Sequence, residues 1–223
     1  MTPYYEHAGI AIYHGDCREV LYTLVDVDVV LTDPPYGIAG SIQLDGRAKG
    51  AYAGGFDDTP DYIRTVVVPV IEVLIARVPC VVMTPGNRCL SSYPQPQSFG
   101  VFYQPAGVGM QSFGTVDAQP IFYYGTAGGG RLGKPCSYIL TETPERNGHP
   151  CVKPFHAWKR LLANVTKPAQ LVLDPFMGSG TTLVAAKDMG LRAIGIEIEE
   201  RYCEIAAKRL SQEALPFAVA EGA

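Results

Sequence analysis

The clearest structural signal in the chain is the run Leu171-Val172-Leu173-Asp174-Pro175-Phe176-Met177-Gly178-Ser179-Gly180-Thr181-Thr182. Its apolar beginning predicts a buried strand, and the segment Thr182–Met189 that follows is predicted to be a helix. Gly178 and Gly180 allow the backbone to approach a ligand closely, and the helix that begins there presents free N–H groups. The run therefore indicates a nucleotide-type binding site at the end of a strand.

An acidic residue follows at an informative distance. The next predicted strand, Ala193–Ile196, ends at Glu197, which lies 23 residues after Asp174. In dinucleotide-binding folds, an acid about 20 residues beyond the glycine turn reaches the ribose hydroxyls. No lysine follows Gly180, so the run is not a phosphate loop of the GxxxxGK[ST] kind. We interpret the turn as a ligand site and not as a purely structural glycine turn.

A second motif, Thr32-Asp33-Pro34-Pro35-Tyr36-Gly37, follows the predicted strand Val27–Leu31. Consecutive prolines remove two backbone donors, so the neighbouring carbonyls remain free to accept hydrogen bonds. Asp33 adds further acceptors, and Tyr36 adds a flat apolar ring. Acceptors beside an aromatic ring suit the exocyclic amine of a nucleobase. Taken alone, the motif is equally compatible with a structural Pro-Pro turn.

The remaining pattern alternates strands with helices, which predicts an α/β fold with a mostly parallel sheet. Further strands are predicted at Ile10–Tyr13, Cys80–Thr84, Val101–Tyr103 and Pro120–Tyr124, and further helices at Arg18–Leu24, Thr59–Ala76 with a kink at Pro69, Phe155–Val165, and from Glu199 to Arg209.

Two regions stand apart from this alternation. Gly37–Gly55 contains six glycines and keeps no helical or strand period. Because long structureless loops in compact domains are commonly functional, it is predicted to be a lid over the Asp33 motif. Residues 88–148 are rich in Ser, Pro, Gln and Gly, with single aromatic residues among them. They are predicted to form a short inserted lobe that serves specificity, within a single domain that spans residues 1–223.

Composition limits the protein class. With 47% hydrophobic and 18% charged residues, the composition is that of a globular protein. The sequence shows neither a membrane span nor a targeting signal, and we expect the protein in the cytoplasm. Its six cysteines form no CxxC pair and lie near no histidine at zinc-finger spacing, so no metal is expected. A net charge of −4 argues against nonspecific coating of nucleic acid.

Together the two motifs resemble those of the DNA amino-methyltransferases, which use S-adenosylmethionine. The catalytic-type motif at Asp33 precedes the cofactor-type motif at Asp174, as in the permuted, beta arrangement of that family. His149-Pro150-Cys151-Val152-Lys153-Pro154 is similar to the family's His-Pro-x-x-Lys-Pro segment, and His14-Gly15-Asp16-Cys17 to its Gly-Asp turn. The resemblance implies a Rossmann-like class I methyltransferase sheet, mostly parallel, with helices on both faces.

The resemblance also implies roles for individual residues. Asp33 and the Pro34 carbonyl, beside Pro35, would accept the hydrogens of a target amine, while Tyr36 stacks on a base flipped out of the DNA. Glu197 would hold the ribose hydroxyls, and Asp16 the adenine amine. Thr181 and Lys153 would lie near the cofactor's carboxylate. The full set of implied cofactor-binding residues is Asp16, Cys17, Asp33, Lys153, Asp174, Pro175, Phe176, Gly178, Ser179, Gly180, Thr181 and Glu197.

The implied activity is site-specific methylation of double-stranded DNA at N6 of adenine, in the manner of a restriction-modification enzyme. Asp at the head of the catalytic motif favours adenine in this family, and N4 of cytosine is the first alternative. Methylation of RNA or of a protein amide, and an inactive DNA-binding homologue, are further alternatives. Pro-Cys pairs at Cys80, Cys136 and Cys151 also leave cytosine C5 methylation open. A homodimer and a partner restriction endonuclease are not determined by the sequence.

Overall fold

The computed structural model describes residues 1–24, 26–38, 58–105, 109–111, 114–127, 135–141 and 153–212. The predicted lid over Gly37–Gly55 therefore lies outside the described residues except for its first two positions. Of the predicted segment His149–Pro154, only Lys153 and Pro154 are described.

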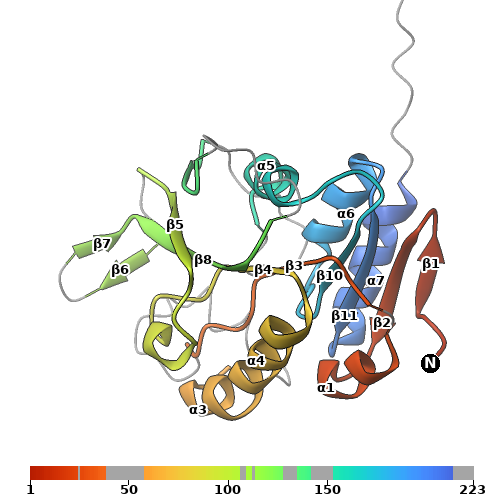
Figure 1. Cartoon of the computed structure of the whole chain (residues 1–223), viewed down its shortest axis with the longest axis horizontal. Helices are drawn as coiled ribbons and strands as arrows, with labels where there is room; N and C mark the ends of the chain where they lie inside the picture. The colour runs from red at the N-terminus through yellow and green to blue at the C-terminus, as the bar shows by residue number, and fades with distance from the viewer. Residues whose placement is uncertain are drawn as a thin grey trace, which may run out of the picture.

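A nine-stranded sheet runs through the molecule in the order β1-β2-β11-β10-β3-β4-β8-β5-β9 (Figure 1). Its strands are β1 (Tyr5–His7), β2 (Ile10–His14), β3 (Val29–Thr32), β4 (Cys80–Met83), β5 (Ser98–Tyr103), β8 (Ala118–Gly125), β9 (Tyr138–Ile139), β10 (Leu171–Asp174) and β11 (Arg192–Glu197). Strands β2, β11, β10, β3 and β4 are parallel to their neighbours in this series. Because parallel strands end at the same edge, the residues that follow them gather there.

Helices cover both faces of the sheet (Figure 1). One face carries α5 (Phe155–Val165), α6 (Thr181–Asp188) and α7 (Glu200–Ser211); the other carries α1 (Cys17–Val20), η1 (Leu21–Thr23), α3 (Pro60–Tyr62), η2 (Ile63–Val67) and α4 (Val68–Arg77), while η3 (Leu90–Ser92) follows β4. The α/β class with a mostly parallel sheet is confirmed.

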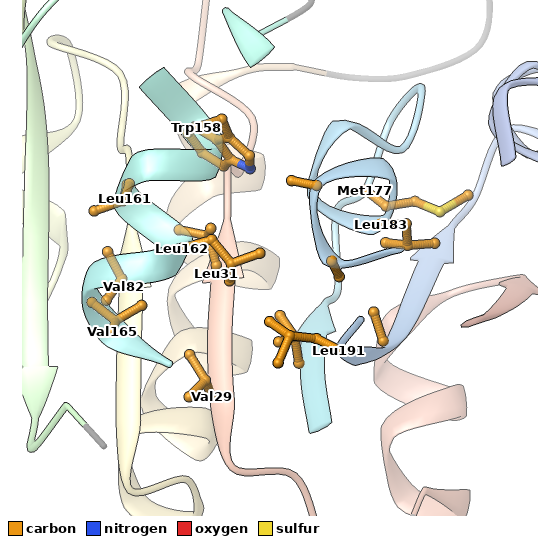
Figure 2. Packing of buried hydrophobic residues seen from close by; sticks show 14 of the residues in the cluster. Val29, Leu31, Val82, Trp158, Leu161, Leu162, Val165, Met177, Leu183 and Leu191 are labelled. Atoms are coloured by element: carbon orange, nitrogen blue, oxygen red, sulfur yellow. The ribbon is translucent and has the colours of Figure 1, made fainter. Parts of the chain in front are cut away.

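The core explains why the central strands are apolar throughout. Val29 and Leu31 of β3 belong to one cluster of buried residues and Val30 to the other, so side chains pack on both faces of the sheet. Figure 2 shows Val29 and Leu31 facing Leu162 and its neighbours on α5. Strands with one exposed face alternate polar and apolar residues. These central strands do not, because both of their faces are buried.

The structure confirms the predicted start of the helix at Thr59 and adds details that were not predicted. The helix predicted from Thr59 does begin there, with the Thr59 side chain accepting a hydrogen bond from the Tyr62 N–H at 3.2 Å. At the expected kink, Pro69 cannot donate to the preceding turn, and the helix widens into the π-helical turn η2. Strand β1 was not predicted, and it pairs antiparallel with β2.

The region predicted as a recognition lobe contributes to the sheet. Strands β8 and β5 pair antiparallel with each other, and β8 also pairs antiparallel with β4, so they extend the central sheet. The hairpin of β6 (Gly109–Gln111) and β7 (Gly114–Val116) forms a separate two-stranded sheet, which protrudes from the body in Figure 1. Among the described residues, no helix is long and apolar enough to cross a membrane, and no cluster of His, Cys, Asp and Glu could hold a metal ion.

Candidate active site

One cavity lies at the edge where the parallel strands end. It is lined by the turns that follow β2, β3, β10 and β11, together with Lys153 just before α5. The lining includes every predicted site residue except Gly180, namely Asp16, Cys17, Asp33, Pro34, Pro35, Tyr36, Lys153, Asp174, Pro175, Phe176, Gly178, Ser179, Thr181 and Glu197. The structure thus brings the two motifs, 141 residues apart in the chain (Asp174 minus Asp33), to the same space.

The buried side chain of Asp174 stabilises the glycine turn, residues 174–180, from inside the protein. Its carboxylate is buried and accepts hydrogen bonds from the Thr32 hydroxyl at 2.7 Å, the Thr182 hydroxyl at 2.5 Å and the Phe176 N–H at 3.2 Å. Trp158 Nε1–H in turn donates to the Thr182 hydroxyl at 2.9 Å. Burial raises the pKa of Asp174 to about 6. Asp174 therefore shapes the cavity wall, because hydroxyl and amide donors of this chain already occupy its oxygens.

The two glycines of this turn have different surroundings. Gly178 has a φ of +51° and donates its N–H to Glu197 Oε2 at 2.9 Å, on the cavity side. Gly180 has a φ of +78° and caps the start of α6. A Cβ on Gly180 would lie 2.8 Å from the Cβ of Ala206, so this glycine allows α6 to pack closely on α7 and does not line the cavity.

Glu197 forms the acidic end of the cavity. Its two carboxylate oxygens accept hydrogen bonds from the backbone N–H groups of Gly178 at 2.9 Å and Glu199 at 2.8 Å. Burial raises its pKa to about 7 in spite of these donors. Each oxygen has a second lone pair, so the carboxylate can accept further hydrogen bonds from a ligand's hydroxyls.

Asp16 and Cys17 line the cavity after β2. Asp16 caps α1 by accepting a hydrogen bond from the Arg18 N–H at 2.8 Å, and its second oxygen pairs with Arg18 Nη2 at 2.6 Å. These bonds to Arg18 hold the pKa of Asp16 below its usual value. Burial raises the pKa of the Cys17 thiol to about 12, so this cysteine is a neutral wall residue.

Asp33 forms the other end and is held by several side chains. Asp33 Oδ2 pairs with Lys153 Nζ at 2.9 Å, while Oδ1 accepts hydrogen bonds from the Tyr36 hydroxyl at 2.7 Å and from the Thr84 hydroxyl. Lys153 Nζ also donates to the Tyr36 hydroxyl and lies 5.0 Å from the centre of its ring. The side chain of Tyr36 packs on Gly86, where a Cβ would lie 2.5 Å from Cβ of Tyr36.

Three members of this site were missed by sequence reasoning. Thr84 follows β4 and Gln119 belongs to β8; Gln119 Nε2 donates to the Tyr36 hydroxyl and lies 3.5 Å from Asp33 Oδ1. Their roles depend on the pairing of β4 with both β3 and β8, which no local pattern shows.

The third missed residue is Asp58, which is buried and lines the cavity. Its carboxylate accepts a hydrogen bond from the backbone N–H of Gly37 at 2.5 Å. Burial raises its pKa. Asp58 thus fixes the backbone that carries Tyr36. Its position two residues before Pro60 gave no signal of this role, because an acid near a helix start is ordinarily a cap or a dipole partner.

Comparison with known proteins places this geometry in a family. A family model described as a DNA methylase matches residues 124–208. The putative methylase YubD of Escherichia coli K12 is 31% identical over an alignment that covers 94% of this chain and 92% of that protein. This chain belongs to the DNA methylase family. The resemblance to DNA amino-methyltransferases noted from the two motifs is confirmed.

Further matches include a relative over a shorter stretch of the chain and two solved structures. The type II methyltransferase M2.DpnII of Streptococcus pneumoniae is 49% identical over 65 residues, and the match spans 29% of this chain and 24% of that relative. Among solved structures, an M1.HpyAVI–SAM complex is 23% identical with a TM-score of 0.65, covering 91% of this chain and 100% of that one. PvuII DNA methyltransferase, titled cytosine-N4-specific, is 15% identical with a TM-score of 0.70, and the match covers 96% of this chain and 90% of that one. These structures confirm the Rossmann-like methyltransferase fold.

Proposed function

We propose that this DNA methylase transfers a methyl group from S-adenosylmethionine to the exocyclic amine of a base flipped out of double-stranded DNA, at N6 of adenine. The observation that carries the proposal is that the Asp33 turn and the Asp174 turn open into one cavity. A methyl donor and an acceptor amine held by these two turns would meet inside it. N4 of cytosine is the alternative target.

The cavity walls suit the methyl donor. At one end, the Glu197 and Asp16 carboxylates offer acceptors for ribose hydroxyls and an adenine amine. Phe176, Met177 and Ile198 add apolar side chains to the cavity lining. At the other end, Lys153 offers a cation for a carboxylate. S-adenosylmethionine supplies a methyl group on a positively charged sulfur, and it is the methyl donor of this enzyme.

The residues of the Asp33 turn hold the target base and its amine. Asp33 and the Pro34 carbonyl accept the two hydrogens of the target amine, which localises the lone pair on its nitrogen and directs it toward the methyl group. The same two acceptors stabilise the positive charge that develops on the nitrogen as the methyl is transferred. The Tyr36 ring stacks on the flipped base, which replaces part of the stacking lost when the base leaves the duplex.

The choice of base rests on the motif. Asp33 heads the catalytic motif, and the resemblance to the family associates an aspartate there with adenine. The structural likeness to the cytosine-N4-specific PvuII enzyme concerns the fold alone, because the two sequences are 15% identical. Cytosine C5 chemistry has less support. Cys80 begins β4 with a pKa that burial raises to about 11, and neither Cys80 nor Cys136 lines the cavity; Cys151 lies outside the described residues.

DNA contact is proposed for the region predicted as the recognition lobe, residues 88–148. The β6–β7 hairpin projects from the body on the side of the sheet where β5 and β8 lie (Figure 1). Gln119, on β8, links this region directly to the catalytic turn. A homodimer and a partner restriction endonuclease form no part of the proposal.

The experiment that tests the proposal identifies the methylated nucleoside. Purified protein is incubated with S-adenosylmethionine and unmethylated genomic DNA, and the DNA is digested to nucleosides for mass spectrometry, with RNA and a protein mixture as parallel substrates. N6-methyladenosine in DNA is the expected product. N4-methylcytosine would replace the proposed base with the alternative. Label in C5-methylcytosine, RNA or protein alone would overturn the proposal.

A further inference from the structure

Lys153 makes a complete set of contacts with the catalytic turn. Its ammonium lies 2.9 Å from Asp33 Oδ2, donates to the Tyr36 hydroxyl, and lies 3.4 Å from Gln119 Oε1. These three oxygens match the three N–H donors of an ammonium group. The Lys153 side chain is 12% exposed and that of Asp33 17%, so the pair is largely shielded from water. Such an ion pair is stronger than one on the open surface.

The donors on Asp33 are divided unequally between its two oxygens. Oδ1 accepts hydrogen bonds from the Tyr36 and Thr84 hydroxyls and lies 3.5 Å from Gln119 Nε2, whereas the Lys153 ammonium lies on Oδ2. The proposed reaction needs Asp33 to accept a hydrogen from the target amine. Because the two lone pairs of Oδ1 are already used, the amine must bind at Oδ2, where it meets the Lys153 ammonium.

The surroundings of these donors indicate which one leaves. Tyr36 is fixed by Gly86 and by the backbone that Asp58 holds, while Thr84 and Gln119 belong to the central sheet or follow it directly. Lys153 precedes α5 and reaches Asp33 through a flexible four-carbon stem. It is also the only one of these donors that carries a charge, so only Lys153 responds to an anion in the cavity.

We infer that Lys153 caps Asp33 until the carboxylate of the methyl donor takes its ammonium, so that cofactor binding opens the target-amine site. This inference rests on the proposed function. It makes Lys153 a positioning residue that couples the two halves of the reaction. The ion pair with Asp33 is exchanged for one with the cofactor, and this exchange clears Oδ2 of Asp33 for the target amine. Cofactor would accordingly bind before the target base.

The exchange has a consequence for affinity that needs no catalysis. Because Asp33 competes with the cofactor's carboxylate for Lys153, removing the charge of Asp33 should tighten binding. The probe is S-adenosylhomocysteine, which carries the carboxylate but lacks the sulfonium charge that Asp33 could attract directly. Its dissociation constant is measured by isothermal titration calorimetry for the wild type, Asp33→Asn, Lys153→Met and the double variant.

Asp33→Asn should bind S-adenosylhomocysteine at least about threefold more tightly than the wild type, as expected for loss of a competing, partly buried ion pair. In the Lys153→Met background the same substitution should change the affinity by less than about twofold, because no shared ammonium remains. 5′-Methylthioadenosine, which has no carboxylate, should bind the wild type and Asp33→Asn equally, and this also shows that the variant is folded.

Asp61→Asn is the matched control, since it makes the same chemical change at a side chain that is 78% exposed and paired with Arg64 outside the cavity. It should leave every affinity unchanged. Unchanged or weaker binding by Asp33→Asn, or a gain that persists without Lys153, would overturn the inference while leaving the proposed function intact. Failure of the wild type to bind S-adenosylhomocysteine would overturn both.

Discussion

The ionisation of Glu197 should make cofactor affinity depend on pH near neutrality. Burial raises the pKa of this carboxyl from 4.5 to about 7, although both of its oxygens accept hydrogen bonds from backbone N–H groups. Ribose hydroxyls would donate to the ionised form, so binding favours deprotonation of Glu197. Affinity for the cofactor should therefore rise as pH increases through about 7 and level off above it.

The size of the change in cofactor affinity follows from the fraction of Glu197 that is ionised. For a pKa of about 7, this fraction falls from about 0.9 at pH 8 to about 0.1 at pH 6, which weakens binding about tenfold, or about 1.4 kcal/mol. A carboxyl at its usual value would stay ionised at both pH values and give no change. Asp174, whose pKa burial raises to about 6, adds about a factor of two at pH 6 if its ionised form is also needed.

The assay is calorimetric titration of S-adenosylhomocysteine at constant ionic strength from about pH 6 to about pH 8. Glu197→Gln should bind more weakly throughout, because an amide can accept from only one of the two backbone N–H groups, and its affinity should vary less than about threefold with pH. His14 lies opposite Glu197 in the register of β2 and β11, so His14→Gln serves as the control for histidine titration and should keep the full slope.

A wild-type affinity that is constant across this range would refute the reasoning, since the carboxyl would then be ionised throughout. A slope that survives Glu197→Gln would assign the titration to another group. A slope that disappears in His14→Gln would assign it to that histidine.

The turn after β10 supports two stability predictions, both measured by denaturant unfolding. Gly180→Ala should lower the free energy of unfolding by at least about 1 kcal/mol more than Gly190→Ala: both glycines have positive φ, but a Cβ meets Ala206 only at Gly180 and nothing within 4 Å at Gly190. Equal losses would show that backbone strain alone matters. Trp158→Phe removes the donor to the buried Thr182 hydroxyl and should cost about 1–3 kcal/mol; an unchanged midpoint would show that this bond does not support the turn.

Much of the fold could be predicted because its signals are local. The bounds of α5 agree with the prediction at both ends, since Trp158, Leu161 and Leu162 repeat at helical spacing and pack on the sheet. The apolar runs of β3, β4 and β10 marked strands buried on both faces. Strand β1 carried no such signal, because Glu6 and His7 are exposed at the sheet's edge.

The sequence could locate those site residues that lie at the end of a predicted strand. Asp174 ends β10 and Asp33 directly follows β3, and the two strands are parallel neighbours, so the topology alone brings these residues together. Thr84, Gln119 and Asp58 could not be found in this way. Each reaches the Asp33 turn through a tertiary contact, and a lone Thr, Gln or Asp is ordinarily a surface or capping residue. The ion pair of Lys153 with Asp33 was equally hidden, since the sequence assigned that lysine to the cofactor.

The central claim is that the Asp33 turn delivers a base amine to the methyl donor. Its most direct test is transfer of a labelled methyl group from S-adenosylmethionine to unmethylated genomic DNA by the wild type and by Asp33→Ala, with unfolding curves recorded for both. The account predicts labelled DNA with the wild type and loss of at least about a hundredfold in rate with the folded variant. A folded Asp33→Ala protein that methylates DNA at the wild-type rate would contradict it.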